Sequence, residues 1–261
     1  MHQLRLFFIA LQFFTRVPVP RWVGFEPTWL QQCARYFPLV GAVVGGCSAL
    51  VLWGAMQLFP ATVSVGLAMA ASVWLTGGFH EDGLADSCDA LGGAVSREKA
   101  LAIMKDSRIG SYGALGLILV LGLKAAVLLG LADTDPALAA LAIVWAHVAS
   151  RAAPVWLLHA LPYAGDADHA KAKPLATQIS GPGLGIALGL VVLATAVGAT
   201  LTPENVPLML GAVVVAAGLT FYMQSMLERR LHGYTGDTLG ATQQVVELGA
   251  LLAFLDRKSV V

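Results

Sequence analysis

Charged residues are scarce in this sequence of 261 residues: they make up 12% of the chain, whereas hydrophobic residues make up 57%. The 16 Lys and Arg residues balance the 16 Asp and Glu residues, so the chain lacks the net basic charge with which proteins bind nucleic acid. The mean hydropathy is +0.73. This composition is typical of an integral membrane protein and excludes nucleic acid as an expected partner.

Several sequence signatures are also missing. The chain has no G-x-S-x-G, no P-loop and no H-E-x-x-H motif, so serine hydrolase, P-loop NTPase and zincin functions have no support. The three cysteines, Cys33, Cys47 and Cys88, lack metal-ligand spacing, and we interpret them as small packing residues outside any disulfide framework. No signal-peptide cleavage site follows the first apolar segment before Arg16, so we expect an N-terminal helix in the membrane interface.

Long uncharged stretches predict an all-α fold, a polytopic bundle of transmembrane helices in one domain of residues 1–261. Residues 36–79 contain no charge, which is enough for two spans joined by a turn at Pro60. A short apolar segment at 241–255 predicts either a short seventh helix or a re-entrant helix. The six spans are expected near residues 39–58, 62–78, 112–131, 137–158, 182–201 and 206–227.

Basic residues gather in alternate connections between these spans. The three remaining connections contain none. Because Lys and Arg collect in cytoplasmic loops, we expect residues 79–111 to form a cytoplasmic active-site loop. The basic residues on this side are Arg5, Arg16, Arg21, Arg35, Arg97, Lys99, Lys105, Arg108, Arg151, Lys171, Lys173, Arg229 and Arg230.

An acidic stretch, GGFHEDGLADSCDALGG at residues 77–93, directly follows the second span. In a helix, Asp82, Asp86 and Asp89 at i, i+4 and i+7 would lie within roughly 60° of one another around the axis. Their mutual repulsion would be removed by Mg²⁺, which takes hard oxygen ligands and leaves room for water and phosphate oxygens. We therefore predict a Mg²⁺ site. The alternative is a solvated helix start, where carboxylates suit the positive end of the helix dipole.

Cations follow in MKDSRIGSYG, residues 104–113. Lys105 and Arg108 could bind a diphosphate, Arg by its planar fork and Lys as a point charge. The alternative is that both charges only anchor the helix at the cytoplasmic surface.

Charges also occur inside the apolar segments. Arg151 lies in the fourth span with His147 one turn before it. An intramembrane arginine needs a partner, either substrate phosphate or one of the clustered carboxylates of the acidic stretch; snorkelling is the alternative. Lys124 in the third span could snorkel or face a polar cavity. Glu247 needs a partner as well, which we expect to be Arg151 or a lysine.

Two further motifs, GYTGDTLGA at residues 233–241 and LPYA at 161–164, could contribute to the same site. Asp237 could cap the helix that opens there, complete a metal site, or accept a proton from a hydroxyl nucleophile. Tyr163 could stack on a base or on the edge of a corrin, although an interfacial tyrosine needs no such role.

Taken together, these motifs resemble the cobalamin synthase family, also called adenosylcobinamide-GDP ribazoletransferase. The sequence departs from the family pattern at Ala90, where a glycine is usual soon after Asp89, and at Gly165, where an arginine often stands. The resemblance extends in order over FTRVPVP (14–20), YFPLVG (36–41), residues 77–93, MKDSRIGSYG (104–113), LPYA (161–164) and GYTGDTLGA (233–241), ending at Glu247.

The resemblance implies the last step of cobalamin nucleotide-loop assembly in a bacterial inner membrane. Adenosylcobinamide-GDP would react with α-ribazole or its 5′-phosphate and release GMP, with Mg²⁺ as cofactor; a ribose hydroxyl would attack the cobinamide-linked phosphate. The corrinoid and nucleoside substrates and the lipid bilayer are the expected partners, and a homo-oligomer or association with other cobalamin-pathway enzymes stays open. The implied metal ligands are Glu81, Asp82, Asp86 and Asp89; the implied substrate contacts are Lys105, Asp106, Arg108, Arg151, Tyr163 and Thr235; and the base is His80 or Asp237.

Two other functions would also place carboxylates at a membrane. A CDP-alcohol phosphotransferase also presents aspartates and glycines to Mg²⁺, but its pattern needs Asp-Gly-x-x-Ala-Arg, and DGLAD at residues 82–86 is one residue shorter and lacks the arginine. A Mg²⁺ or cobalt transporter would carry carboxylates at mid-membrane depth in several spans, whereas here they crowd one connection.

Overall fold

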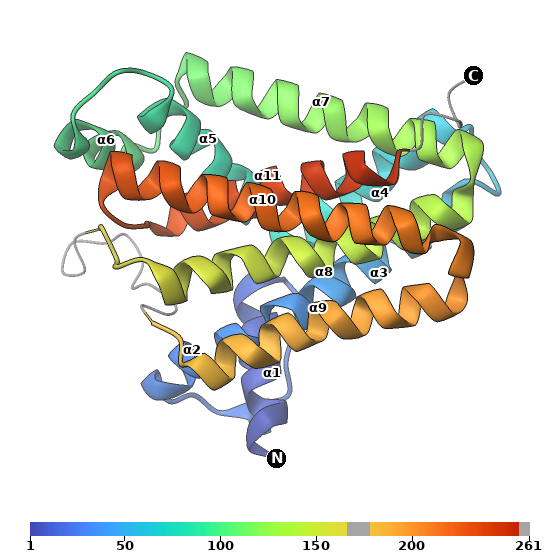
Figure 1. Cartoon of the computed structure of the whole chain (residues 1–261), viewed down its shortest axis with the longest axis horizontal. Coiled ribbons are helices and arrows are strands. Elements are labelled where there is room, and N and C mark those ends of the chain that lie inside the picture. The colour runs from blue at the N-terminus through green and yellow to red at the C-terminus, as the bar shows by residue number, and fades with distance from the viewer. Residues whose placement is uncertain (166–177, 256–261) are drawn as a thin grey trace.

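The computed structural model describes residues 1–165 and 178–255, and it confirms the all-α prediction (Figure 1). Within those ranges β-structure is limited to one bridge between Tyr163 and Tyr234. The shorter helices are α1 (His2–Phe14), η1 (Arg21–Val23), α2 (Pro27–Cys33), η2 (Ala34–Tyr36), α5 (Phe79–Leu91), α6 (Arg97–Met104) and η3 (Pro203–Asn205). The longer helices are α3 (Phe37–Ala55), α4 (Ala61–Thr76), α7 (Ser111–Thr134), α8 (Pro136–Ala160), α9 (Gly181–Leu201), α10 (Val206–Leu231) and α11 (Gly236–Phe254).

Five segments of the described chain are long and apolar enough to cross a membrane. A sixth candidate arises if α4 and α5 are counted as one span with an 88° bend. Helix α11 is not among the candidates, and it begins at Gly236, earlier than the segment 241–255 predicted from its apolar residues. The five candidate segments of the described chain are Pro27–Ala55, Ser111–Thr134, Pro136–Ala160, Gly181–Leu201 and Pro203–Leu231.

Helix α8 forms the centre of the bundle. Its most apolar stretch is 83% buried, against 22% for α7 and 17% for α9, so α7 and α9 present most of their apolar surface outward, where lipid would lie. Figure 1 shows the long helices side by side, with α7 at one edge of the bundle and α9 at the other. Helix α3 approaches α8 closely because Gly41 and Gly45 face it; a side chain at Gly41 would collide with the backbone of His147.

The N-terminal helix α1 lies at a steep angle to the long helices (Figure 1). Leu6 and Ala10 are fully buried against the bundle, whereas Leu4 is 46% exposed. This one-sided burial is what the sequence predicts for a helix lying in the membrane interface.

Two glycines cause the bend between α4 and α5. Gly77 has φ +70° and Gly78 has φ +73°, a left-handed conformation that side chains other than glycine rarely adopt. The acidic stretch that follows is helix α5. The connection predicted at residues 79–111 contains two helices, α5 and α6, and the aspartates of the acidic stretch lie on a helix, as their spacing predicts.

The three cysteines have free thiols, as predicted, but they do not all pack inside the protein. Cys33 is buried and Cys88 is partly buried. Cys47 is exposed on α3, so its interpretation as a packing residue is wrong. A small apolar side chain on the outer face of a membrane helix contacts lipid as readily as protein, and hydrophobicity alone could not separate the two.

Candidate functional site

The acidic residues of α5 lie on a helix that packs between α11 and α7. Asp82 is exposed, while Asp86 and Asp89 are partly exposed. The helix is held close to α11 by glycines: a Cβ at Gly83 would lie 2.7 Å from the carbonyl oxygen of Asp237. The close approach brings the first turn of α11, with Asp237, beside the part of α5 that carries Asp82 and Asp86.

Asp89 is bound to the start of the next membrane helix. Its Oδ2 accepts a hydrogen bond from the backbone N–H of Gly110 (2.7 Å), and its Oδ1 accepts one from Gly113 (2.8 Å). These N–H groups belong to the helix terminus of α7, where donors lack partners inside the helix. Asp89 therefore ties the end of α5 to the start of α7, a partner that sequence spacing did not indicate.

The described residues contain no group of three or more His, Cys, Asp or Glu side chains that could hold a metal ion by themselves. The donors on α5 nevertheless suit Mg²⁺, which is commonly bound by one or two carboxylates together with substrate phosphates and water. Asp82 and Asp86, four residues apart on one helix face, provide such a pair.

The predicted phosphate-binding cations lie in the connection between α6 and α7. Lys105 is exposed at the end of α6. Arg108 is paired with Asp106, with Nε 3.0 Å from Oδ1, and the Arg108 side chain is 86% exposed. The hydrogen bonds and negative charge of Asp106 raise the pKa of Arg108, so its charge is permanent. Both cations are accessible to a ligand.

The two candidate bases have different surroundings. The His80 side chain is 4% exposed and stacks on the ring of Phe14, with ring centroids 5.5 Å apart and an angle of 16° between the planes. Asp237 is partly exposed in the first turn of α11. Of the two, Asp237 is the more accessible to a substrate hydroxyl.

Thr235, rather than Asp237, caps α11, so this part of the sequence interpretation is wrong. The Thr235 hydroxyl accepts a hydrogen bond from the backbone N–H of Thr238 (3.3 Å), and the Thr238 hydroxyl accepts one from the backbone N–H of Thr235 (2.8 Å). Both partners are needed for this reciprocal arrangement, which satisfies two helix-end donors. Thr235 also donates to the sulfur of Met104.

Tyr163 lies against Tyr234 in the one β-bridge of the described chain. The backbone N–H of Ala164 donates to the Tyr234 carbonyl (2.8 Å), and the two tyrosine rings are 5.6 Å apart. Burial raises the pKa of Tyr234, so its phenol stays protonated. The connection after Gly165 lies outside the described residues.

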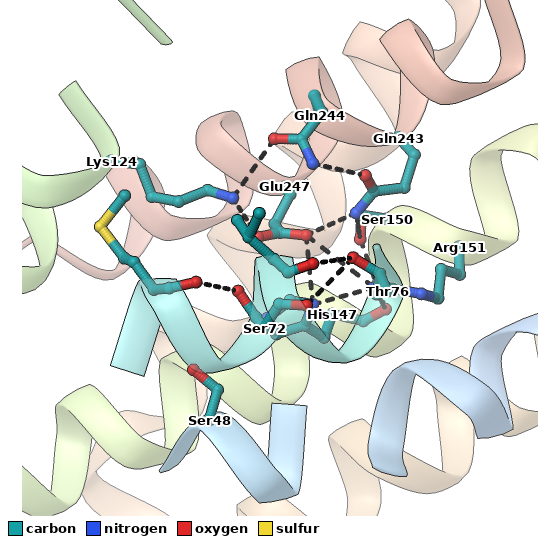
Figure 2. Close-up of polar contacts among 12 residues, drawn as sticks. Ser48, Ser72, Thr76, Lys124, His147, Ser150, Arg151, Gln243, Gln244 and Glu247 are labelled. Atoms are coloured by element: carbon teal, nitrogen blue, oxygen red, sulfur yellow. Dashed lines mark hydrogen bonds and ion pairs between the residues drawn. The ribbon is translucent and has the colours of Figure 1, made fainter. Parts of the chain in front are cut away.

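A second group of polar residues lies inside the bundle, and we call it the buried charge network (Figure 2). Glu247 lies at its centre: Lys124 Nζ is 2.6 Å from Oε1, His147 Nδ1 is 3.2 Å from Oε2, and Arg151 Nη1 is 3.9 Å from Oε2. Both predicted partners of Glu247, Arg151 and a lysine, are confirmed, and the lysine is Lys124. The network consists of Lys124, His147, Ser150, Arg151, Gln243, Gln244 and Glu247.

Lys124 therefore faces polar groups instead of snorkelling, and Arg151 is matched by a carboxylate of the bundle. Gln243 donates to both Glu247 and the hydroxyl of Ser150. A cavity of about 10 Å³, the size of one water molecule, borders Lys124 and Glu247. Charged residues inside apolar segments, Lys124, Arg151 and Glu247, indicate such a network in the sequence, and Gln243 and Gln244 lie in the same apolar helix as Glu247.

The helices that can cross a membrane define a multi-pass membrane protein. Its acidic helix α5 and the exposed cations Lys105 and Arg108 form a polar region outside the long helices. The sequence matches the family described as cobalamin-5-phosphate synthase over residues 6–255. The chain belongs to this family.

Relatives from several bacteria support this assignment. A protein from Leptothrix cholodnii, named adenosylcobinamide-GDP ribazoletransferase, is 62% identical over 97% of this chain and 96% of its own length. A protein of the same name from Shewanella oneidensis is 44% identical over 94% of this chain and 92% of its own. A protein of the same name from Shewanella pealeana is 43% identical over 97% of this chain and 95% of its own length. No solved structure matches the chain.

Proposed function

We propose that this protein is a membrane transferase that joins adenosylcobinamide-GDP to α-ribazole, or to its 5′-phosphate, and releases GMP. The observation that carries the proposal is 62% identity over 97% of the chain to a relative named for this reaction. A ribose hydroxyl oxygen bonds to the cobinamide-linked phosphorus as the bond from that phosphorus to the GMP oxygen breaks. The product is adenosylcobalamin or its 5′-phosphate.

The reaction needs the negative charge of a diphosphate to be offset. Asp82 and Asp86 would hold Mg²⁺, which supplies neutralising charge to the phosphate oxygens when bound. Lys105 and Arg108 would bind the same phosphates directly, because both are exposed. Asp82 and Asp86 are preferred because Asp82 is exposed and Asp86 lies four residues further along the same helix face. Asp89 binds the start of α7, and Glu81 hydrogen-bonds to Gln244.

Asp237 is the proposed acceptor of the hydroxyl proton. It lies in the first turn of α11 and its backbone touches α5 at Gly83, between Asp82 and Asp86. His80 is the less suitable of the two predicted bases, because its ring lies under Phe14.

The site is proposed to face the cytoplasm of a bacterial cell, in its inner membrane. Support comes from basic residues around the end of α5: Arg97 donates to the carbonyl of Leu231 (2.7 Å) and Arg230 donates to that of Gly93 (2.8 Å). The turns between α3 and α4, α7 and α8, and α9 and α10 contain no Lys or Arg. Basic residues mark the cytoplasmic side of membrane proteins.

The test uses detergent-solubilised, folded protein with adenosylcobinamide-GDP and α-ribazole 5′-phosphate, with and without Mg²⁺. GMP and the corrinoid product are measured by chromatography. We expect equal amounts of both, formed only when Mg²⁺ is present. Folded protein that releases no GMP would refute the proposal, and release of CMP from a CDP-alcohol would indicate a CDP-alcohol phosphotransferase instead.

A further inference from the structure

Glu81 and Asp82 are adjacent in α5 but have opposite surroundings. Successive helix residues point about 100° apart. Asp82 is exposed, whereas Glu81 Oε1 accepts a hydrogen bond from Gln244 Nε2 on α11 (3.1 Å) and its Oε2 is buried without a hydrogen-bond partner among the described residues. The Glu81 carboxylate therefore points into the protein, away from the face that carries Asp82.

Gln244 connects Glu81 to the buried charge network. Its Oε1 accepts a hydrogen bond from Lys124 Nζ (3.3 Å), and Lys124 Nζ lies 2.6 Å from Glu247 Oε1. Gln244 Nε2 is shared between Glu81 and Gln243. A continuous chain of hydrogen bonds thus runs from the first turn of α5 to the ion pairs in the middle of the bundle.

The charges of the network balance only when Glu81 is included. Lys124 and Arg151 carry two positive charges, and Glu247 carries one negative charge. His147 adds no charge, because its Nδ1 accepts a hydrogen bond from Arg151 Nη1 (2.9 Å) and therefore carries no proton. Glu81 would supply the second negative charge, and its Oε1 reaches the network through the hydrogen bond from Gln244 Nε2 (3.1 Å). A buried charge without a counter-charge is strongly unfavourable, so the interior needs the charge of Glu81.

We propose that Glu81 is a positioning residue of the transferase site and not a metal ligand. Its carboxylate completes the charge balance of the network and fixes the rotation of α5, which the backbone contact between Gly83 and Asp237 holds at a second point. Together these contacts set the direction in which Asp82 and Asp86 point. The inference rests on the function proposed above for those two aspartates.

The test compares Glu81→Gln, Asp82→Asn and the double variant Glu81→Gln/Lys124→Met, which restores neutrality to the network. GMP release is measured against Mg²⁺ concentration, and the midpoint of thermal unfolding is measured in detergent. For Glu81→Gln we expect kcat to fall about tenfold and the midpoint of thermal unfolding to fall by about 5 °C or more. The Mg²⁺ concentration that gives half-maximal GMP release should change less than about twofold. Adding Lys124→Met should recover at least about half of both losses.

Asp82→Asn should behave differently: we expect the Mg²⁺ concentration for half-maximal GMP release to rise more than about tenfold. Adding Lys124→Met to Asp82→Asn should not reverse this rise. Glu81→Gln with the same rise in Mg²⁺ requirement, or a double variant no better than Glu81→Gln, would overturn the inference. If Glu81→Gln does not fold, a folded double variant supports the inference and an unfolded one overturns it. An unchanged Asp82→Asn would instead refute the proposed metal site, while the unfolding midpoints still test the network.

Discussion

Two ion pairs of similar length have very different environments in this protein. Lys124 and Glu247 are paired in the middle of the bundle, with side chains 6% and 3% exposed, whereas Arg108 and Asp106 are paired near α6 with 86% and 38% exposure. Breaking a buried pair leaves a charge without water or partner, but an exposed charge is solvated at once. The comparison indicates that the buried pair maintains structure, while the exposed cation is available to bind substrate.

The same division runs through α5 itself. Glu81 contacts the buried charge network, and Asp82, the next residue, faces outward. Helix α5 can therefore expose charge on its outer face, while its inner face contacts an interior whose charges balance. Substitutions on the outer face should therefore affect catalysis, and those on the inner face should affect stability first.

Asp82→Asn should have the largest effect. We expect the rate of GMP release to fall about 100-fold or more, because Asp82 is one of the two carboxylates proposed to hold Mg²⁺, and loss of such a ligand removes several kcal/mol of transition-state stabilisation. The unfolding midpoint should stay near that of the unmodified protein, since Asp82 is exposed. Asp133→Asn, an exposed substitution in α7, is the matched control and should retain full activity. Near-normal GMP release by Asp82→Asn would end the metal-site assignment.

Glu247→Gln should have the largest effect on stability. It leaves Lys124 and Arg151 without their central counter-charge, and loss of one partner from a buried pair costs about 3–5 kcal/mol. Thermal unfolding in detergent measures the change, with Glu204→Gln on η3 as an exposed control. Adding Lys124→Met should recover more than half of the loss, and a double variant as unstable as Glu247→Gln would contradict the role of the pair.

Gly83→Ala tests the contact between α5 and α11. The new methyl group would meet the carbonyl oxygen of Asp237, so we expect a loss of about 1–3 kcal/mol in stability, together with reduced GMP release. Gly66→Ala in α4 is the control, because no atom lies within 4 Å of a Cβ there, and it should be neutral or slightly stabilising. Equal unfolding midpoints for the two variants would show that the helices do not meet closely at Gly83.

Arg108→Ala should have the smallest effect. We expect the KM for adenosylcobinamide-GDP to rise about tenfold, as for loss of one charge-assisted hydrogen bond to phosphate, with kcat and the unfolding midpoint little changed. Steady-state kinetics measure this, and Arg21→Ala, another exposed arginine, should leave KM unaltered. A large drop in the unfolding midpoint would mean that Arg108 is structural after all.

Sequence reasoning predicted the all-α fold with several candidate membrane helices, because long uncharged segments have few alternatives to crossing the membrane. It also predicted that Glu247 needs a cationic partner, since a lone carboxylate in an apolar helix is unfavourable. It could not choose between Arg151 and Lys124, and the structure uses both. Such choices depend on which helices become neighbours: Lys124 and Gln244 are 120 residues apart in sequence.

The candidate site was predicted less completely than the fold. Periodicity placed Asp82, Asp86 and Asp89 on one face of a helix, but it could not indicate that Asp89 binds the start of α7. The motif at residues 233–241 predicted a helix start, but Thr235 provides the cap in place of Asp237. In both cases several side chains could satisfy the same backbone groups, and only the packed structure decides which one does.

In the proposed reaction a ribose hydroxyl displaces GMP from the cobinamide-linked phosphorus, and phosphorus labelling tests this displacement most directly. Purified protein is given α-ribazole 5′-phosphate and adenosylcobinamide-GDP labelled with ³²P at the cobinamide-linked phosphate only. We predict that all transferred label is found in the corrinoid product and that the released GMP is unlabelled. Label in the released nucleotide, or no labelled product from folded protein, would contradict it.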